Sequence, residues 1–217
     1  MGLGNLLPGK RVAVGSRKKW ESQISSNDSV LDVGCWGGRK LTELSLQTKK
    51  LHGMDITESN FGLASPEIRS RLKVGDVTKS IPFDDKFDWI IFGEVLEHVS
   101  DDEAALKNIS RALKKGGKLI LTTPRSVKGF QAWDPAWFRW KVLGGQRHYH
   151  YSGKELASKL RGHGLKIKEY YILGNSKWVF CRWFNVFLNY VLRINKKISP
   201  RKETDGFCDW FLLVEKE

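Results

Sequence analysis

The stretch from Val30 to Gly38, VLDVGCWGG, constrains the fold of this chain more than any other part of it. A short apolar run ends here in a glycine-rich turn, residues 39–48 continue with helical spacing, and a second apolar run follows at 49–56. Strand, helix and strand in this order predict a βαβ unit, from which parallel sheets are built. The turn presents backbone N–H groups and a helix N-terminus, which suit a nucleotide-like ligand, although many purely structural turns also contain three glycines.

The same alternation continues to the end of the chain. Further strands are predicted at residues 71–77, 86–94, 118–124, 165–173 and 207–217, with helices at 100–117 and 152–164. We therefore expect an α/β fold with a doubly wound, seven-stranded, mostly parallel sheet. A length of 217 residues suits a single domain, 1–217, which begins with a basic segment at 1–27 containing a short helix near 18–24.

Two segments, 125–150 and 175–206, interrupt the alternation. Both follow predicted strands, so we expect them on the side of the sheet where α/β folds bind ligands. Within 177–194, polar residues form one narrow stripe on an otherwise apolar, strongly aromatic helix: Arg182, Asn185, Asn189 and Arg193. Three interpretations remain open for this helix: a lid over a lipophilic pocket, a contact with an anionic membrane interface aided by the basic stretch 195–202, or a helix packed on the sheet with one solvated edge.

The charge of the chain favours anionic partners. Lys and Arg number 37 against 24 Asp and Glu, a formal net charge of +13, which leaves nucleic acid, an anionic membrane surface and a phosphorylated substrate open. Three cysteines, Cys35, Cys181 and Cys208, form no C-x-x-C pair, so neither a disulfide framework nor a zinc site is predicted. Without the apolar core of a signal peptide, the expected location is cytoplasmic, with a peripheral place at the inner membrane surface left open.

Two acidic residues end the second and third predicted strands. Asp55 stands where dinucleotide-binding folds place an acid that accepts hydrogen bonds from ribose hydroxyls. Asp76 is placed to accept a hydrogen bond from the amino group of an adenine. Each is also compatible with an ordinary turn. The glycine turn upstream favours the ligand-binding interpretation.

Taken together, these motifs resemble the class I S-adenosylmethionine-dependent methyltransferases. The pieces that carry the resemblance are VLDVGCWGG, HGMDI, VGDV, IPFDDKFDWIIFGEVLEHV and LKKGGKLILTTP, which span about residues 28–173. They are most similar to the branch that modifies small molecules and lipids, such as the ubiquinone-biosynthesis O-methyltransferases. The resemblance implies S-adenosyl-L-methionine as cofactor and a sheet whose last hairpin is reversed.

The resemblance also implies roles for individual residues. Asp32 and Gly34 would flank the methionine part of the cofactor, with Cys35 and Trp36 in the same turn and Gly38 at the helix start. The remaining cofactor residues would be Asp55 with Ile56 at the ribose, Asp76 with Val77 at the adenine, and Glu94 facing methionine and acceptor.

Trp36 departs from the family pattern. The family usually has Gly-x-Gly-x-Gly, whereas this chain has Gly34-Cys35-Trp36-Gly37-Gly38. We predict that the Trp36 ring faces away from the reacting sulfonium, either packed under the turn or forming a wall of the acceptor pocket.

Methyl transfer requires alignment of donor and acceptor, and a general base only where the acceptor must lose a proton. The candidate bases are His98, His148 and His150, although His98 is equally compatible with a helix cap. Arg147 is the candidate partner of an anionic substrate group, with Tyr149 beside it. No metal site is predicted, because Asp101 and Asp102 are better explained as first-turn helix acids.

The expected function is methylation, at oxygen or nitrogen, of a small-molecule or lipid-linked acceptor that carries an anionic group. RNA or protein methylation is an alternative that the charge would suit, but Glu-Val-Leu-Glu stands where many nucleic-acid amino methyltransferases have Asn/Asp-Pro-Pro-aromatic, so nucleic acid is not favoured. A catalytically silent cofactor-binding protein of the same fold is a further alternative, for which Trp36 is the best argument. A nicotinamide-dependent dehydrogenase is less well supported, because GCWGG does not supply Gly-x-Gly-x-x-Gly.

Overall fold

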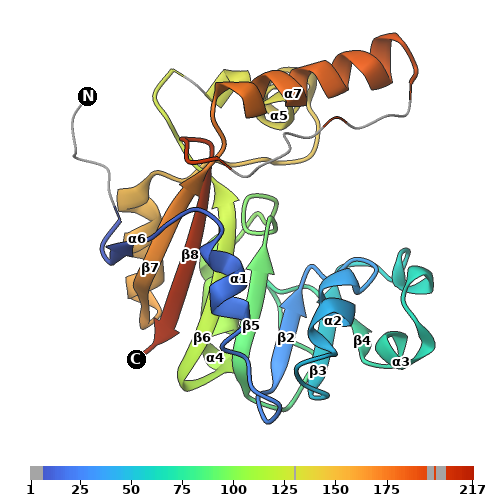
Figure 1. Ribbon diagram of the computed structural model, residues 1–217, viewed down its shortest axis with the longest axis vertical. Coiled ribbons are helices and arrows are strands. Elements are labelled where there is room, and N and C mark those ends of the chain that lie inside the picture. Colours follow the sequence, from blue (N-terminus) through green and yellow to red (C-terminus); the bar gives the residue numbers. More distant parts are fainter. Residues whose placement is uncertain (1–6, 130, 195–197, 199–203) are drawn as a thin grey trace.

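The protein was studied as a computed structural model, which describes residues 7–129, 131–194, 198 and 204–217. Eight strands form one sheet in the order β1-β7-β8-β6-β5-β2-β3-β4 (Figure 1). The strands are β1 Lys10–Arg11, β2 Val30–Val33, β3 Leu51–Asp55, β4 Leu72–Val74, β5 Phe87–Gly93, β6 Leu113–Pro124, β7 Leu165–Leu173 and β8 Asp209–Lys216. The α-helices are α1 Ser16–Glu21, α2 Arg39–Leu44, α3 Pro66–Arg69, α4 Asp102–Ala112, α5 Pro135–Leu143, α6 Gly153–Gly162 and α7 Ser176–Val186. Single turns of other helix types are η1 Phe61–Leu63, η2 Gln131–Trp133 and the π-helical η3 Phe187–Val191.

The sheet is parallel except for β8, which pairs antiparallel with both β6 and β7. This confirms the predicted α/β class and the reversed final hairpin. All seven predicted strands are present, and the eighth is β1, which pairs in parallel with β7. The sequence analysis missed β1 because it contains only two residues, both exposed, and therefore has no apolar periodicity.

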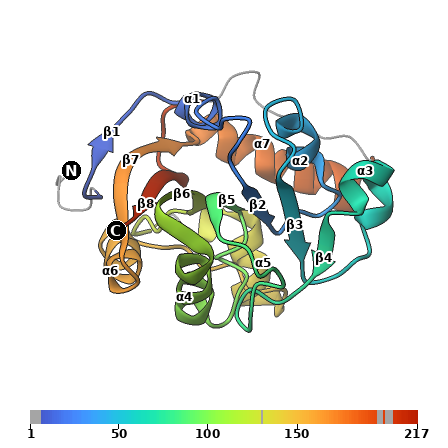
Figure 2. The ribbon, with the colours of Figure 1, turned by 90° about the horizontal axis from the view of Figure 1, so that it is seen from below.

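Helices cover both faces of the sheet (Figure 2). On one face, α1, α2 and α3 pack over a core that includes Trp20, Leu41 and Ile68. On the other face, α4 and α6 contribute Leu106 and Leu156 to a second core. Side chains of the central strand β5 are buried on both faces, as expected of a parallel strand between two helical layers.

The helix after β5 begins and ends through local capping. The Asp101 carboxylate accepts a hydrogen bond from the Ala104 N–H at 2.9 Å, which makes Asp101 the N-cap of α4, and Asp102 lies in its first turn. The helix-cap interpretation of His98 is therefore wrong, since His98 lies in the turn before the cap. The helix is shorter than the predicted 100–117, because β6 begins directly at Leu113.

The two insertions supply helices that lie beyond the carboxyl ends of the strands (Figure 1). Helix α5 was not predicted, although its signals are in the sequence: Asp134 caps it through the Ala136 N–H, Pro135 occupies its first turn and Gly144 ends it with φ 66°. The predicted helix 177–194 is present as α7 followed by η3. Most of the basic stretch 195–202 lies outside the described residues. Within the described ranges, no helix has both the length and the apolar character needed to cross a membrane.

Candidate active site

A cavity of about 500 Å³ opens at the carboxyl ends of β2, β3 and β5, where the chain order of the sheet reverses. Small-molecule sites in α/β sheets typically form at this reversal, and the volume falls within the usual range of about 300–1,000 Å³. Eight of the predicted site residues line it: Gly34, Trp36, Asp55, Ile56, Asp76, Val77, Glu94 and His98. The remaining lining residues were not predicted: Val33, Met54, Gly75, Thr78, Val95, Val99, Ser100 and Gln146. Except for Ser100, each of these directly adjoins a predicted residue in the sequence, and for most of them the strand ends were the available signal.

The glycine turn approaches the neighbouring strand end closely. Gly34 has φ 78°, and a Cβ atom there would lie 2.3 Å from Cγ2 of Val95 in the turn after β5. Any side chain at this position would collide with Val95 and strain the backbone. Gly34 therefore allows the two turns that border the cavity to meet.

Trp36 also adopts a left-handed backbone conformation, with φ 48°. Its N–H donates a 2.8 Å hydrogen bond to Oδ2 of Asp55, and its side chain is 57% exposed and lines the cavity. The ring therefore does not pack under the turn, which excludes one of the two predicted placements. A non-glycine residue in this region costs about 1–2 kcal/mol, and the hydrogen bond to Asp55 helps to hold it there.

Hydrogen bonds from nearby turns hold the two acids at the ends of β3 and β4. Asp55 receives the Trp36 N–H, which links the turn after β2 to the end of β3. Oδ1 of Asp76 accepts hydrogen bonds from the Thr78 hydroxyl at 2.7 Å and the Thr78 N–H at 2.9 Å, and these lower the pKa of Asp76. Both side chains border the cavity as hydrogen-bond acceptors, the property that ribose hydroxyls and an adenine amino group require.

Three predicted cofactor residues do not line the cavity, and each has a visible structural role. Asp32 is buried, and burial raises its pKa to about 7 despite the opposing charges of Arg17 and Lys40. Cys35 is buried in the α2 side of the core. Gly38 caps α2 with φ 70°, and a Cβ atom there would lie 2.8 Å from Ile68 Cγ2. A role in cofactor binding for these three stays a prediction.

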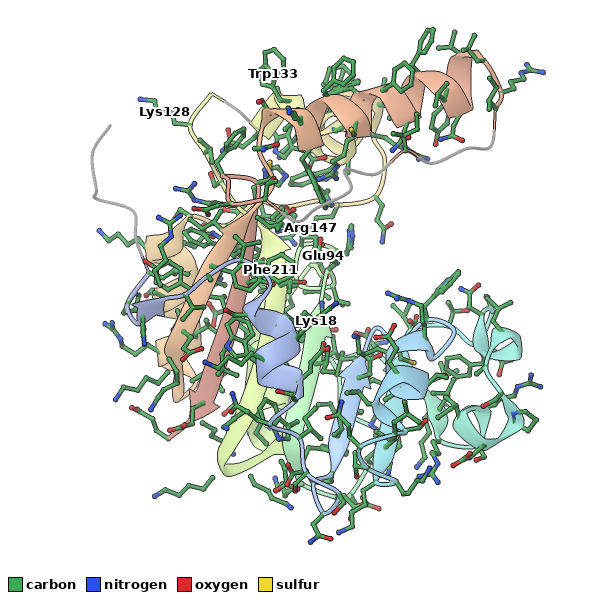
Figure 3. The ribbon with its side chains drawn as sticks, in the orientation of Figure 1. Lys18, Glu94, Lys128, Trp133, Arg147 and Phe211 are labelled. Atoms are coloured by element: carbon green, nitrogen blue, oxygen red, sulfur yellow. The ribbon has the colours of Figure 1, made fainter. Side chains whose placement is uncertain are left out.

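Glu94 occupies the turn after β5 with φ 57°, and its side chain is exposed at the cavity. Its N–H donates to the Thr122 carbonyl at 3.0 Å, which continues the pairing of β5 with β6 beyond the strand end. Glu94 lies between the sheet edge and the α5–α7 layer in the view of Figure 3, as does Arg147.

His98 is held in one tautomer. Its Nδ1 lies 2.6 Å from the Arg147 carbonyl oxygen, and because a carbonyl can only accept, Nδ1 carries the proton and Nε2 keeps a lone pair in the neutral ring. Burial lowers the pKa of His98, and the nearby His148 and Arg147 add to this effect. A neutral, half-buried imidazole at the cavity is suited to accept a proton.

Glu97 was missed by the sequence analysis, although it lies in the quoted EVLEHV motif. The side chain is fully buried, its Oε2 faces the Thr123 hydroxyl at 3.4 Å, and its Oε1 has no hydrogen-bond partner among the described residues. Burial and the nearby charge of Glu94 raise its pKa well above the ordinary glutamate value. Oε1 lies 3.7 Å from Nε2 of His98, so a protonatable acid sits directly beside the candidate base.

His148 and His150 do not line the cavity. Both are buried, and the Nε2 atom of each lies 3.1 Å from Oδ2 of Asp134, while Arg182 binds Oδ1 of the same carboxylate at 2.8 Å. Burial opposes ionisation of Asp134, but the histidine hydrogen bonds and the Arg182 charge outweigh it and hold the pKa of Asp134 far below its usual range. We call Asp134, His148, His150 and Arg182 the junction cluster, because it joins α5, α7 and the segment before α6. The catalytic roles of the two histidines stay predictions.

The two predicted substrate residues have partners within the protein. The Arg147 guanidinium donates to the Glu97 carbonyl at 2.9 Å and lies over the Tyr149 ring, 4.9 Å from its centroid. The Tyr149 hydroxyl donates to Glu155 at 3.0 Å. These contacts fix the segment that positions His98, while direct substrate binding by either residue stays a prediction.

Within the part of the chain that the structure describes, two groups of side chains converge closely enough to hold a metal ion, whereas no metal site was predicted from the sequence. They are Glu97, His98 and His148, and Asp134, His148 and His150; within each group the potential ligand atoms lie within 4.8 Å of one another. In the second group Asp134 is already bound by Arg182 and two imidazoles, and neither Nδ1 has, among the residues that the structure describes, the hydrogen-bond partner that metal-binding histidines usually have. The sequence does not show these groups, because only the fold brings Glu97 and His98 to His148, and Asp134 to His148 and His150.

Comparison with known proteins identifies the family. A protein family described as "Methyltransferase domain" matches residues 14–170, most of the chain and all of the cavity-lining residues. The chain belongs to this family.

Sequence relatives and solved structures agree with this assignment. The methyltransferase is 32% identical over 109 residues to the ubiquinone biosynthesis O-methyltransferase of Coxiella burnetii, covering 48% of this chain and 47% of that protein. It thus spans about half the length of the curated relatives it matches. Among solved structures it is similar in fold to an S-adenosylmethionine-dependent methyltransferase of Methanosarcina mazei, with TM-score 0.62 and 18% identity over 91% of this chain and 96% of that one.

A third comparison concerns the cofactor. An N-methyltransferase of Bradyrhizobium japonicum, solved with S-adenosyl-L-homocysteine, aligns with TM-score 0.58 and 15% identity over 93% of this chain and 86% of that one. For this chain, S-adenosyl-L-methionine is the cofactor that the sequence resemblance implies. The cavity fits it, because the acceptor groups of Asp55 and Asp76 border a space of about 500 Å³ at the end of the glycine turn.

Proposed function

We propose that the methyltransferase transfers the methyl group to an oxygen or nitrogen of a small or lipid-linked acceptor, with His98 as general base. The carrying observation is the His98 geometry: Nδ1 is fixed on the Arg147 carbonyl, the pKa is lowered by burial, and the ring lies at the cavity. The likeness to an O-methyltransferase over about half its length supports a hydroxyl acceptor, which must lose a proton.

Residues of this chain can bind the cofactor and take up the acceptor proton. When bound, the cofactor supplies a methyl group on a sulfonium leaving group, so the protein mainly aligns the reactants and excludes water. Asp55 and Asp76 hold the two ends of the nucleoside by accepting hydrogen bonds. His98 takes the acceptor proton at Nε2, and Glu97, kept largely protonated by burial, limits the negative charge beside it.

A second cavity supports an apolar portion on the acceptor. It measures about 550 Å³, lies between the η2–α5 segment and α7, and is lined almost entirely by apolar side chains: Ala132, Trp133, Phe138, Ser176, Val179, Phe180, Trp183 and Phe207. Three of these also line a small polar cavity with Asp134, His150, Arg182 and Asp209. The apolar cavity therefore adjoins the junction cluster, and His148 of that cluster lies against His98, with ring centroids 5.1 Å apart.

One experiment separates cofactor binding from catalysis. Thermal shift with S-adenosylhomocysteine and turnover on a panel of phenol and amine acceptors are measured for the wild type, His98→Asn and Asp55→Asn. We expect His98→Asn to keep the thermal shift and lose about 10²–10⁴-fold in turnover, and Asp55→Asn to lose the shift. Asp85→Asn, an acid outside the cavity, serves as the control.

The pH dependence provides the second readout. Because the lowered pKa of His98 must be exceeded for the ring to act as a base, wild-type turnover should rise with pH below about 6.5 and stay level above it. Equal turnover in His98→Asn contradicts the base role. A cofactor shift with no turnover on any acceptor favours instead the catalytically silent protein for which Trp36 argues.

A further inference from the structure

Helix α7 presents its polar stripe to the protein and its aromatic side to the outside. Arg182 binds the buried Asp134, and the Asn185 side chain both donates to the Ile198 carbonyl and accepts the Ile198 N–H, each at 2.8 Å. Within the predicted polar stripe, Arg182 and Asn185 thus make internal contacts, whereas Arg193 at its end is exposed. No residue of α7 is buried.

The opposite side of the helix carries a continuous apolar stripe. It consists of Phe180, Phe184, Phe187 and Val191, spaced four, three and four residues apart. Adjacent rings stack with centroids 6.0 and 6.2 Å apart, while Phe180 is 69% and Val191 64% exposed. Further exposed apolar side chains lie nearby in the chain and on α5: Val142, Leu143, Tyr190 and Leu192. A helix on a water-exposed surface normally turns its polar side outward, whereas here the apolar side is exposed.

The charges of the same segments point to the partner. Residues 125–150 and 175–198 contain ten Lys and Arg but a single acid, Asp134, which is already bound by Arg182. Among the cations that lie in the described ranges, five are exposed: Lys128, Arg139, Lys141, Lys177 and Arg193. Lys128 and Trp133 project from this end of the molecule in Figure 3.

We propose that the outer face of α7, η3 and α5 binds the interface of an anionic lipid bilayer. Aromatic and aliphatic side chains enter the boundary between headgroups and acyl chains, and the lysines and arginines contact anionic headgroups. Because no described helix is long and apolar enough to span a membrane, the protein lies on the surface. A second copy of this chain is a weaker occupant, since it would bring the same positive charges into contact.

This placement explains where the apolar cavity opens. Phe180, on the exposed stripe, also lines the 550 Å³ cavity together with Trp133 and Phe138. A lipid-linked acceptor can then pass from the bilayer into the cavity without exposing its chain to water. The passage of an acceptor into the cavity rests on the proposed function, whereas the binding of the protein to vesicles does not.

The test is co-sedimentation of the full chain with vesicles of phosphatidylcholine alone or with about one-third phosphatidylglycerol. We expect binding to the anionic vesicles only, weakened at about 1 M salt, where the Debye length is about 3 Å. Phe180→Ser with Val191→Ser should lower the partition coefficient about tenfold. The matched control is Leu46→Ser, which removes a side chain that is 91% exposed elsewhere and should have no effect.

Two double variants that reverse lysine charges test the electrostatic part of the proposal. Lys141→Glu with Lys177→Glu should reduce binding, whereas Lys107→Glu with Lys115→Glu, on exposed sites outside the insertions, should change it less. Unchanged thermal shift with S-adenosylhomocysteine shows that each variant is folded, and this shift reports on the proposed function independently of vesicles. The proposal is overturned if the wild type does not sediment with anionic vesicles, or if Phe180→Ser with Val191→Ser sediments as the wild type does. Dimerisation that depends on Phe180, without vesicle binding, identifies a second copy as the occupant and also overturns it.

Discussion

Trp36 shows how one residue can carry a backbone conformation that its side chain disfavours. Trp36 has a left-handed backbone, with φ 48°, a conformation that glycine adopts without strain. The hydrogen bond from Trp36 N–H to Asp55 and the close approach of Gly34 to Val95 leave the turn little freedom to relax.

This conformation predicts an unusual order of stabilities. Trp36→Gly should be about 1 kcal/mol more stable than Trp36→Ala in urea unfolding, because glycine adopts positive φ without strain. At Lys107, an exposed position inside α4, the order should reverse, with Ala more stable than Gly by about 1 kcal/mol. If Ala is the better replacement at both positions, the left-handed conformation at Trp36 is not a real constraint. Tighter binding of S-adenosylhomocysteine by Trp36→Gly would show that the ring hinders the cofactor.

Among the elements, α5 and α7 depend on a charged cluster for their placement. Asp134 caps α5, receives both histidine rings and binds Arg182 of α7. The Trp183 indole N–H adds a hydrogen bond to the Trp133 carbonyl at 2.6 Å. Since neither helix contains a buried residue, these polar contacts replace the apolar packing that normally holds a helix in place.

We therefore expect Asp134→Ala to destabilise the protein by about 2 kcal/mol, through loss of charged hydrogen bonds and a helix cap. Asp205→Ala, which removes the exposed ion pair with Arg11, should cost less than about 1 kcal/mol. Hydrogen exchange should show the Asp134 effect concentrated in α5 and α7, with β2, β5 and β6 unchanged. A uniform increase in the hydrogen-exchange rate across the sheet would contradict the inference that Asp134 stabilises α5 and α7 locally.

At the level of the whole molecule, buried acids should shape the stability as a function of pH. Burial raises the pKa of Asp32 to about 7, that of Asp209 to about 8 and that of Glu97 well above its usual value. In the unfolded chain these groups lose their protons near pH 4, whereas in the folded protein Asp32 keeps its proton until about pH 7 and Asp209 until about pH 8. The folded state therefore binds more protons in this window, so its stability falls as pH rises.

The melting temperature should accordingly be several degrees lower at about pH 8 than at about pH 5. Below about pH 4 it should fall again, because Asp134 and Asp88, whose pKa values are lowered, lose their favourable ionised forms. Asp209→Asn should flatten the decline between about pH 5 and pH 8, and Asp205→Asn, on the surface, should not. A melting temperature that rises from about pH 5 to pH 8 contradicts this account.

Local patterns were sufficient for much of the fold and half of the site. Strand and helix periods, the glycine turn and the acids at strand ends predicted the sheet and the cavity residues Gly34, Asp55, Asp76 and Glu94, because each signal is complete within one short segment. His98 was also named as a candidate base, because it lies in the LEHV piece of the motif that resembles the family.

The features that could not be predicted from the sequence depend on which surfaces meet after folding. Glu97 differs from an ordinary surface glutamate only by its burial, and the junction cluster joins Asp134, His148 and His150 of one insertion to Arg182 of the other. The sequence of α7 showed one polar stripe and one aromatic side but not their directions. Periodicity fixes the angle between two faces of a helix, whereas the direction in which each face points is set by the hydrogen-bond partners that the rest of the chain brings to it.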